Sequence, residues 1–452
     1  MLLPFTTLFS RVFAVDSNLS SDMKMNIHTL ASGVRPREVW SWAMFDFANS
    51  GYTTVVITAV FNAYFVAEVA DNAPWATLAW TGALAVSYAL IMITAPILGA
   101  YADAHAAKKR LLVASTLGCI AFTAALATVG RGDLWLAITL IVLSNYCFGS
   151  GENLIAAFLP ELAQGEALGR VSGWGWSLGY LGGLVSLGAC LAYVIRAQAQ
   201  GMAATGFVPV TMLITAAIFA LASLPTFLFL RERAVPVSNA GAVVREAFAR
   251  LRDTLRHAHR YTDLRRFLIC IVFYQAGIQA VIALAAVYAH QVMGFTTRDT
   301  LLLILLVNIT AAAGAFLFGQ MQDRLGHVRT IVLTLAGWIV AVLLVYAAQS
   351  PPLFWVAANL VGVCLGSSQS AGRALVGYMS PPARTAEFFG LWGMAVKLSS
   401  ILGPVTYGAV TWVTNGDHRL AILITGTYFV AGIAIIASLD VRRGRAAALG
   451  PE

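Results

Sequence analysis

The sequence predicts an all-α polytopic membrane protein with twelve transmembrane helices in two six-helix halves. Three observations indicate this fold class. Only 11% of the 452 residues are charged and 59% are hydrophobic, whereas an ordinary soluble domain has about 25% charged residues. The apolar residues form runs of the length that crosses a bilayer as a helix, which is about 20 residues. A motif of the first half returns in the second half, 220 positions later.

Twelve apolar runs are each long enough to span a membrane. They are continuous and do not alternate with a period of two residues, which excludes an outer-membrane β-barrel. Because so few charged residues cannot supply a polar shell, lipid must replace water around most of the surface. The predicted spans are residues 39–66, 78–101, 111–130, 134–160, 169–195, 208–230, 267–291, 300–321, 329–348, 353–378, 386–413 and 419–438.

The positions of the basic residues predict the orientation. Of the 29 Lys and Arg residues, 23 lie in the tails, in the connections of one side or at the ends of spans on that side. The positive-inside rule therefore places both tails, residues 1–36 and 441–452, in the cytoplasm. We expect a monomeric protein of the plasma (inner) membrane whose net charge of +8 reflects the membrane and not nucleic-acid binding. The other six basic residues lie in the opposite connections or within spans: Arg131, Arg196, Arg298, Arg419, Arg373 and Lys397.

The longest connection, residues 231–266, separates an N-terminal bundle (residues 37–230) from a C-terminal bundle (residues 267–440). The connection is rich in arginine. Its apolar residues recur at helical spacing, which predicts an amphipathic helix whose arginines face anionic lipid head groups. A solvated basic linker explains the pattern equally well. The apolar residues are Val244, Phe248, Leu251 and Leu255.

We expect no cofactor and no bound metal. The five cysteines lie in five different apolar runs, with no Cys-x-x-Cys pair and no neighbouring histidine, which is typical of small hydrophobic core residues. The two histidines of "RHAHR" at 256–260 lack carboxylate or cysteine companions and are weak evidence for a metal site.

Two copies of one loop motif lie at equivalent positions of the two halves. "GAYADAHAAKKR" begins at Gly99 and "GQMQDRLGHVRT" at Gly319. Both resemble the signature loop of the major facilitator superfamily, and parallel six-span repeats are the architecture of that superfamily. The first copy departs from the pattern at Ala106, where a glycine is usual. The resemblance implies a conformational latch made of Gly99, Asp103, Lys109, Gly319, Asp323 and Arg329.

Three further stretches narrow the resemblance. "WAMFDFANSGYTTVV" in the first span, residues 156–183 and residues 386–404 resemble signatures of the unknown-major-facilitator family, and they occur in the expected order and on the expected spans. That family includes the fungal vacuolar amino-acid effluxer linked to autophagy. The resemblance covers the chain from Val39 to about Ser438 and implies a transporter, with amino acids as the favoured substrates.

The fifth span is dense in glycine, as "GRVSGWGWSLGYLGG" shows. Small residues let helix backbones approach closely in lipid, so we expect close packing here. The aromatic residues Trp174, Trp176 and Tyr180 stand near the end of the span, where an interfacial aromatic belt is favoured over a cavity lining.

Polar residues line one face of the first, fourth, seventh and tenth spans. In the first span Asp46, Asn49, Ser50 and Thr53 recur at helical spacing. In the major facilitator architecture these four spans line the central cavity. The sequence therefore predicts a substrate and proton pathway built from Asp46, Asn49, Thr53, Glu152, Asn153, Gln275, Gln279, Gln369 and Arg373, together with Lys397 of the eleventh span.

Four charged residues at membrane depth suggest ion pairs between the halves. Glu152 with Arg373, or Asp46 with Lys397, would reduce the cost of burying the charges. The alternative is that the pairs are static and only hold the halves together. Asp46 lies near a span end, so a plain helix-end role is equally compatible with its position. Glu152 is the deeper candidate for proton coupling, because protonation and conformation become linked when a carboxylate alternates between water and a cation.

The function predicted is gradient-driven transport of a small polar metabolite, with efflux of an amino acid or similar zwitterion favoured and proton coupling expected. The chain has no ATP-binding Gly-x-x-x-x-Gly-Lys-Ser/Thr motif. It also lacks the catalytic motifs of membrane hydrolases, so we do not expect an enzyme. The alternative is a non-transporting sensor or a lipid scramblase on the same fold. A route open to lipid through the fifth and eighth spans would favour the scramblase.

Overall fold

The computed structural model describes residues 30–165, 167–234, 236, 261–295 and 297–450. The amphipathic helix predicted in the connection between the halves, the histidine pair at 256–260 and most of the N-terminal tail lie outside the described residues.

The described residues contain twelve helices long and apolar enough to cross a membrane, as the sequence predicted. The first span, Pro36–Val69, combines two α-helical and two π-helical segments. The first half contains α2 (Pro36–Gly51), η2 (Tyr52–Ala59), α3 (Phe61–Tyr64), η3 (Phe65–Val69), α4 (Ala76–His105), α5 (Lys108–Ala125), η4 (Leu126–Thr128), α6 (Leu134–Ala156), α7 (Leu159–Leu162), α8 (Ala167–Ala199) and α9 (Ala204–Phe229).

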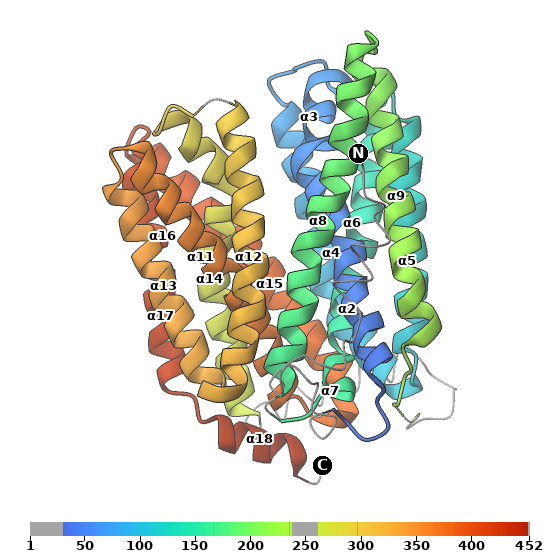
Figure 1. Cartoon of the computed structure of the whole chain (residues 1–452), viewed down its shortest axis with the longest axis vertical. Coiled ribbons are helices and arrows are strands. Elements are labelled where there is room, and N and C mark those ends of the chain that lie inside the picture. Colours follow the sequence, from blue (N-terminus) through green and yellow to red (C-terminus); the bar gives the residue numbers. More distant parts are fainter. Residues whose placement is uncertain (1–29, 166, 235, 237–260, 296, 451–452) are drawn as a thin grey trace, which may run out of the picture.

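The second half repeats the arrangement and ends in a short helix that lies across one end of the bundle (Figure 1). Helices α16 and α17 together form the twelfth span. The second half contains α11 (Thr262–Gln291), α12 (Thr297–Leu325), α13 (His327–Ala347), α14 (Pro351–Met379), η5 (Pro382–Arg384), α15 (Thr385–Val413), α16 (His418–Thr425), α17 (Thr427–Ala437) and α18 (Val441–Leu449).

The two signature loops, between α4 and α5 and between α12 and α13, lie at the same end of the molecule, which we call the basic end. The ribbons of the two halves meet at the basic end and lie apart at the opposite end (Figure 1). Helix α18 is docked at the basic end by Arg443, whose Nε and Nη2 donate to the Asp263 carboxylate at 2.6 and 2.7 Å. Hydrogen bonds also cross between the halves at this end, from Glu387 N to Asp103 and from Arg170 N to Asp323, so the structure is closed at the basic end.

The loop between α4 and α5 turns through a residue with positive φ. Ala106 has φ 47° and ψ 51°, the left-handed conformation that glycine adopts without penalty. An alanine there costs on the order of 1 kcal/mol. The equivalent turn of the second half uses Gly326, at φ 86°. Both turns therefore use a positive φ, but their ψ angles differ, 51° at Ala106 and 159° at Gly326.

Glycines on α8 permit the close packing that the sequence predicted. A Cβ added at Gly182 would overlap the carbonyl oxygen of Phe47 on α2, whereas a Cβ added at Gly188 meets nothing within 4 Å. The difference arises because the two positions face different sides of one helix.

This contrast predicts opposite effects of the same substitution. Gly182→Ala should destabilise the protein by about 1–3 kcal/mol, because the added methyl group forces the helices apart. Gly188→Ala should be neutral or stabilise by up to about 1 kcal/mol, because alanine has the higher helix propensity. Thermal unfolding of the two purified variants in detergent measures the difference. Equal unfolding midpoints would contradict the close contact between α2 and α8.

Candidate functional site

Two ion pairs join the halves at membrane depth. Arg373 Nη1 of α14 lies 2.7 Å from Asp46 Oδ2 of α2. Lys397 Nζ of α15 lies 3.5 Å from Glu152 Oε2 of α6. The sequence alone left the pairing of these four residues open, and the structure pairs Asp46 with Arg373 and Glu152 with Lys397. Each pair takes its carboxylate from the first half and its cation from the second half.

Arg373 is held by two helices of the first half. Besides its bond to Asp46, it donates from Nε to Ser172 Oγ at 3.1 Å and from Nη2 to the Ser172 carbonyl oxygen at 2.9 Å. Its guanidinium carbon lies 4.7 Å from the ring centre of Trp42 and 5.3 Å from that of Trp176. Arg373 is only 3% exposed. These contacts satisfy the guanidinium from three directions and leave it enclosed.

The sequence analysis did not single out two of these partners and misplaced a third. Trp42 and Ser172 lie within stretches that resemble the family signatures, but nothing in those stretches distinguishes them as partners of an arginine. Gly175 matters because a Cβ there would overlap both Asp46 Oδ2 and the Trp42 ring. Trp176 was expected in an interfacial belt, and that interpretation is wrong because its ring contacts Arg373. Asp46 itself is 7% exposed and ion-paired, so the helix-end role in which it reaches the membrane surface does not describe it.

The second ion pair is looser and more accessible. The side chains of Lys397 and Glu152 are 11% and 26% exposed. Lys397 Nζ also lies 5.3 Å from the ring centre of Tyr88 on α4, a contact that the sequence did not indicate. An ammonium over an aromatic face is held by the ring's negative electrostatic potential. A carboxylate, an ammonium and an aromatic ring are thus gathered at one partly open position.

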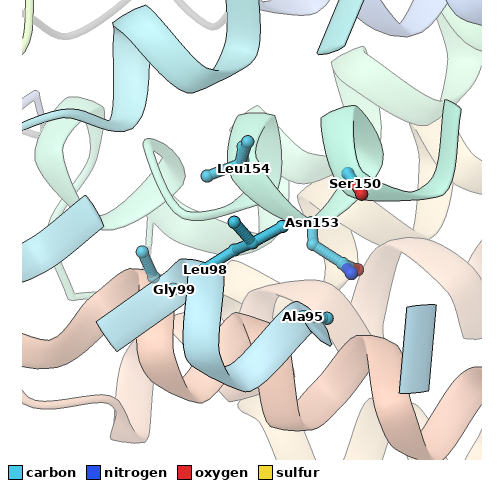
Figure 2. A pocket seen from close by; sticks show the side chains of 7 residues that line it. Ala95, Leu98, Gly99, Ser150, Asn153 and Leu154 are labelled. Carbon is cyan, nitrogen blue, oxygen red and sulfur yellow. The ribbon is translucent and has the colours of Figure 1, made fainter. Parts of the chain in front are cut away.

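Polar residues beside this pair lie at the contact between α4, α6 and α15. Figure 2 shows a small pocket lined by both Ser150 and Asn153. Both side chains are more than 90% buried, and Ser150 Oγ and Asn153 Nδ2 have no hydrogen-bond partner among the described protein groups. The Asn153 amide lies where a Cβ on Gly393 of the second half would stand. Asn153 therefore inserts into the interface between the halves.

The remaining predicted pathway residues differ in their burial and in their hydrogen bonds. Gln275 Nε2 donates to Gln369 Oε1 at 2.7 Å, which ties the seventh span to the tenth. Asn49 is buried next to Ser50, while Gln279 is half-buried. Thr53 is exposed, because α2 gives way to the π-helix η2 at Tyr52 and the α-helical register used for the prediction does not continue. The described contacts bring neither Gln279 nor Thr53 to the ion pairs.

The two signature loops act symmetrically on the opposite half. Asp103 accepts a hydrogen bond from the backbone N–H of Glu387 in the first turn of α15, at 2.9 Å. Asp323 accepts one from the backbone N–H of Arg170 in the first turn of α8, at 3.2 Å. A carboxylate at a helix N-terminus satisfies free N–H groups and complements the helix dipole. Gly99 and Gly319 let the backbones approach, against Ala386 and against Gly169 and Gly173.

The cation at the first signature loop is Lys108 and not the predicted Lys109. Lys108 Nζ forms an ion pair with Glu161, lies 3.7 Å from Asp103 and donates to Thr385 Oγ1 of the second half at 3.0 Å. Lys109 Nζ instead donates to the carbonyl oxygen of Leu230 at 2.6 Å. Arg329 of the second loop is exposed.

Comparison with known proteins places the chain among transporters. The family described as "Vacuole effluxer Atg22 like" matches residues 80–449. A Bacillus subtilis protein named as an uncharacterised MFS-type transporter, YxiO, is 27% identical over 403 residues, covering 88% of this chain and 93% of that protein. Autophagy-related protein 22 of Eremothecium gossypii is 22% identical over 348 residues, covering 70% of this chain and 68% of that protein.

Solved structures confirm the fold class. The human organic anion transporter MFSD10 superposes with a TM-score of 0.68 at 17% identity, covering 88% of this chain and 99% of that one. The major facilitator proton:xylose symporter XylE superposes with a TM-score of 0.69 at 14% identity, covering 88% of this chain and 94% of that one. The two six-helix halves are those of the major facilitator fold.

Proposed function

Since the chain belongs to the family of Atg22-like vacuole effluxers, whose relatives include MFS-type transporters, we propose that it is a secondary active transporter for a small polar metabolite. Transport proceeds by alternating access, in which the closed basic end opens as the opposite end closes. An amino acid or a similar zwitterion is the favoured substrate, and efflux is the favoured direction.

The observation that carries this proposal is the partly exposed pair of Glu152 and Lys397. A zwitterion offers an ammonium group to Glu152 and a carboxylate to Lys397, so it can replace the direct contact between them without leaving either charge unpaired. The Tyr88 ring supplies an apolar face with a negative electrostatic potential beside the cation. The pair joins the two halves, so a substrate bound between Glu152 and Lys397 contacts both halves at once.

Proton coupling is assigned to Glu152. Its side chain is 26% exposed and therefore within reach of water, while its cation lies on the other half. Protonation of Glu152 would remove its attraction to Lys397 and release the second half for movement. Asp46 is enclosed with Arg373 and is the poorer candidate for exchange of a proton with water.

The orientation and surroundings follow from the charges. We place the basic end in the cytoplasm, with both termini on that side, in a plasma (inner) membrane. Anionic lipids would bind the arginine-rich connection at 231–266, of which residues 237–260 lie outside the described structure. The transporter is proposed to act as a monomer on protons and a small molecule, without nucleic acid and without catalysis.

A scramblase or sensor on the same fold is the alternative. A scramblase would need a route to lipid between the fifth and eighth spans. At the basic end these spans, α8 and α12, pack backbone to backbone, since a Cβ added at Gly319 would lie 3.0 Å from Gly173 Cα. This contact favours the transporter.

A screen of thermal stability tests the substrate site. Purified protein is heated with amino acids, peptides, sugars and organic anions across a range of pH. A ligand of the folded state at about 100 times its Kd stabilises it by about 2.7 kcal/mol, so the unfolding midpoint rises. We expect the rise with amino acids and its loss in Lys397→Met. Arg131→Met, which removes an exposed ion pair with Glu68, is the control. A rise that survives Lys397→Met, or no rise with any amino acid, would contradict the proposed site.

A further inference from the structure

We propose that Asp46, Ser172 and Arg373 form a gate that keeps the basic end closed, and that this gate is separate from the substrate pair Glu152 and Lys397. The inference rests on the proposed function, because a gate has meaning only for a protein whose two ends open in turn. Arg373 is then a positioning residue for transport and does not itself contact the substrate.

The first argument is the location of the contacts. Arg373 lies six residues before the end of α14 at Met379, and Ser172 lies five residues after the start of α8 at Ala167. At 1.5 Å per residue both are within roughly 10 Å of the basic end of their helices. The residues that must separate when the basic end opens therefore include this cluster.

The second argument is that one side chain joins three helices across the interface. Arg373 of α14 binds Asp46 of α2 and Ser172 of α8. Ser172 also donates a hydrogen bond to the second half, from its Oγ to the carbonyl oxygen of Ser370 at 2.8 Å. Opening breaks all these bonds together, because every one of them runs between the halves.

The third argument is the lack of room for a ligand. Trp42 and Trp176 lie within 4.7 and 5.3 Å of the guanidinium carbon, and the space beside Asp46 and Arg373 exists only because residue 175 is glycine. The Glu152 side chain is 26% exposed, whereas that of Arg373 is 3% exposed. In the closed state Arg373 serves only the interface.

The fourth argument links the gate to the substrate pair through charge. Asp46 and Glu152 both belong to the first half, and their cations Arg373 and Lys397 both belong to the second half. When the halves part, the carboxylates of Asp46 and Glu152 stay together on the first half, and Arg373 and Lys397 stay together on the second. Each half then holds two like charges away from their partners, which is unfavourable unless ions or a substrate compensate them. The empty transporter therefore stays closed at the basic end.

Labelling of a cysteine introduced at a buried position of the basic end tests the gate. Ala386 of α15 is 3% exposed, packs on Gly99 and lines the pocket between the halves. Ala386→Cys is made in a background whose native cysteines are replaced by alanine, and the purified full-length protein in detergent is treated with a bulky maleimide. The replaced cysteines are Cys119, Cys147, Cys190, Cys270 and Cys364.

Asp46→Asn should raise the labelling rate of the thiol introduced by Ala386→Cys by about tenfold or more, because the closed state loses the ion pair that favours it. Arg373→Lys should give a smaller rise, since lysine can reach Asp46 but cannot also bind Ser172. If Asp46→Asn does not fold, Arg373→Lys and Ser172→Ala carry the test. Glu68→Gln, which removes only an ion pair whose Arg131 side chain is 65% exposed, is the matched control and should change the rate by about twofold or less.

Two outcomes would overturn the gate. The first is that every gate variant that folds has a lowered unfolding midpoint but an unchanged labelling rate. The cluster would then be a structural contact only. The second is a rise with the control Glu68→Gln as large as that with Asp46→Asn. Labelling needs no substrate, so it can succeed when the thermal screen finds no ligand, and the two proposals can fail independently.

Discussion

Replacing Glu152 with glutamine should abolish pH-driven uptake or efflux in proteoliposomes and leave the protein folded. Glutamine keeps the size of the side chain and a polar group toward Lys397, but it neither carries the charge nor exchanges the proton. Flux of the amino acid identified by thermal stability, measured across pH with an imposed pH gradient, should fall to the level of empty liposomes.

The matched control is Glu68→Gln. Glu68 forms an ion pair with Arg131, whose side chain is 65% exposed, and such exposed pairs contribute little to stability. Its flux should equal that of the wild type. Both variants should elute from a size-exclusion column at the volume of the folded wild-type protein. Transport by Glu152→Gln that matches the wild type at every pH would remove Glu152 from the coupling mechanism. Downhill exchange that persists without response to pH would instead separate substrate binding from coupling.

The sequence predicted the spans well because membrane insertion depends on local hydropathy. The predicted and observed spans differ mainly at their ends, because contacts with other helices decide how far a helix extends. The second span was expected at 78–101 and extends as α4 to His105. The added turn contains Asp103, whose carboxylate is stabilised by the N-terminus of α15 in the other half. The hydropathy of the segment cannot reveal this contact, because the partner lies in the other half of the sequence.

The charged residues of the site were also readable from the sequence, since each lies at a depth where a charge needs a partner. The choice of partner was not readable. It depends on how the halves meet, and there the decisive residues are the small ones: Gly175 makes room for Arg373 beside Asp46, and Ser172 binds it. Tyr88 was missed because a tyrosine in an apolar span has no pattern that distinguishes a cation contact from ordinary packing.

The π-helical turns of the first span explain why Thr53 does not share the burial of Asp46 and Asn49. A face drawn at positions i, i+3, i+4 and i+7 assumes α-helical geometry throughout. In this span the assumption holds to Gly51 and then ends. Asp46 and Asn49 are therefore buried and Thr53 is exposed, and the place of Thr53 on the pathway stays a prediction.

Replacing Lys108 should give the largest loss of stability. Lys108 is 1% exposed and is the cation shared by Asp103 and Glu161. Lys108→Ala leaves both carboxylates without it in a buried site, and removing one partner of a buried ion pair costs about 3–5 kcal/mol. Lys109→Ala removes only the bond to the Leu230 carbonyl oxygen and should cost about 1 kcal/mol. Thermal unfolding in detergent compares the two variants directly.

The comparison decides between two neighbouring lysines as the latch cation. The motif predicted Lys109, while the structure assigns Lys108, which also holds Thr385 of the second half at 3.0 Å. If the loss comes from unpaired carboxylates, adding Glu161→Gln to Lys108→Ala should recover part of it, because the two sites share one interaction and their effects do not add. Equal losses for the two lysines, or no recovery in the double variant, would show that the buried pair is not the source of stability at the basic end.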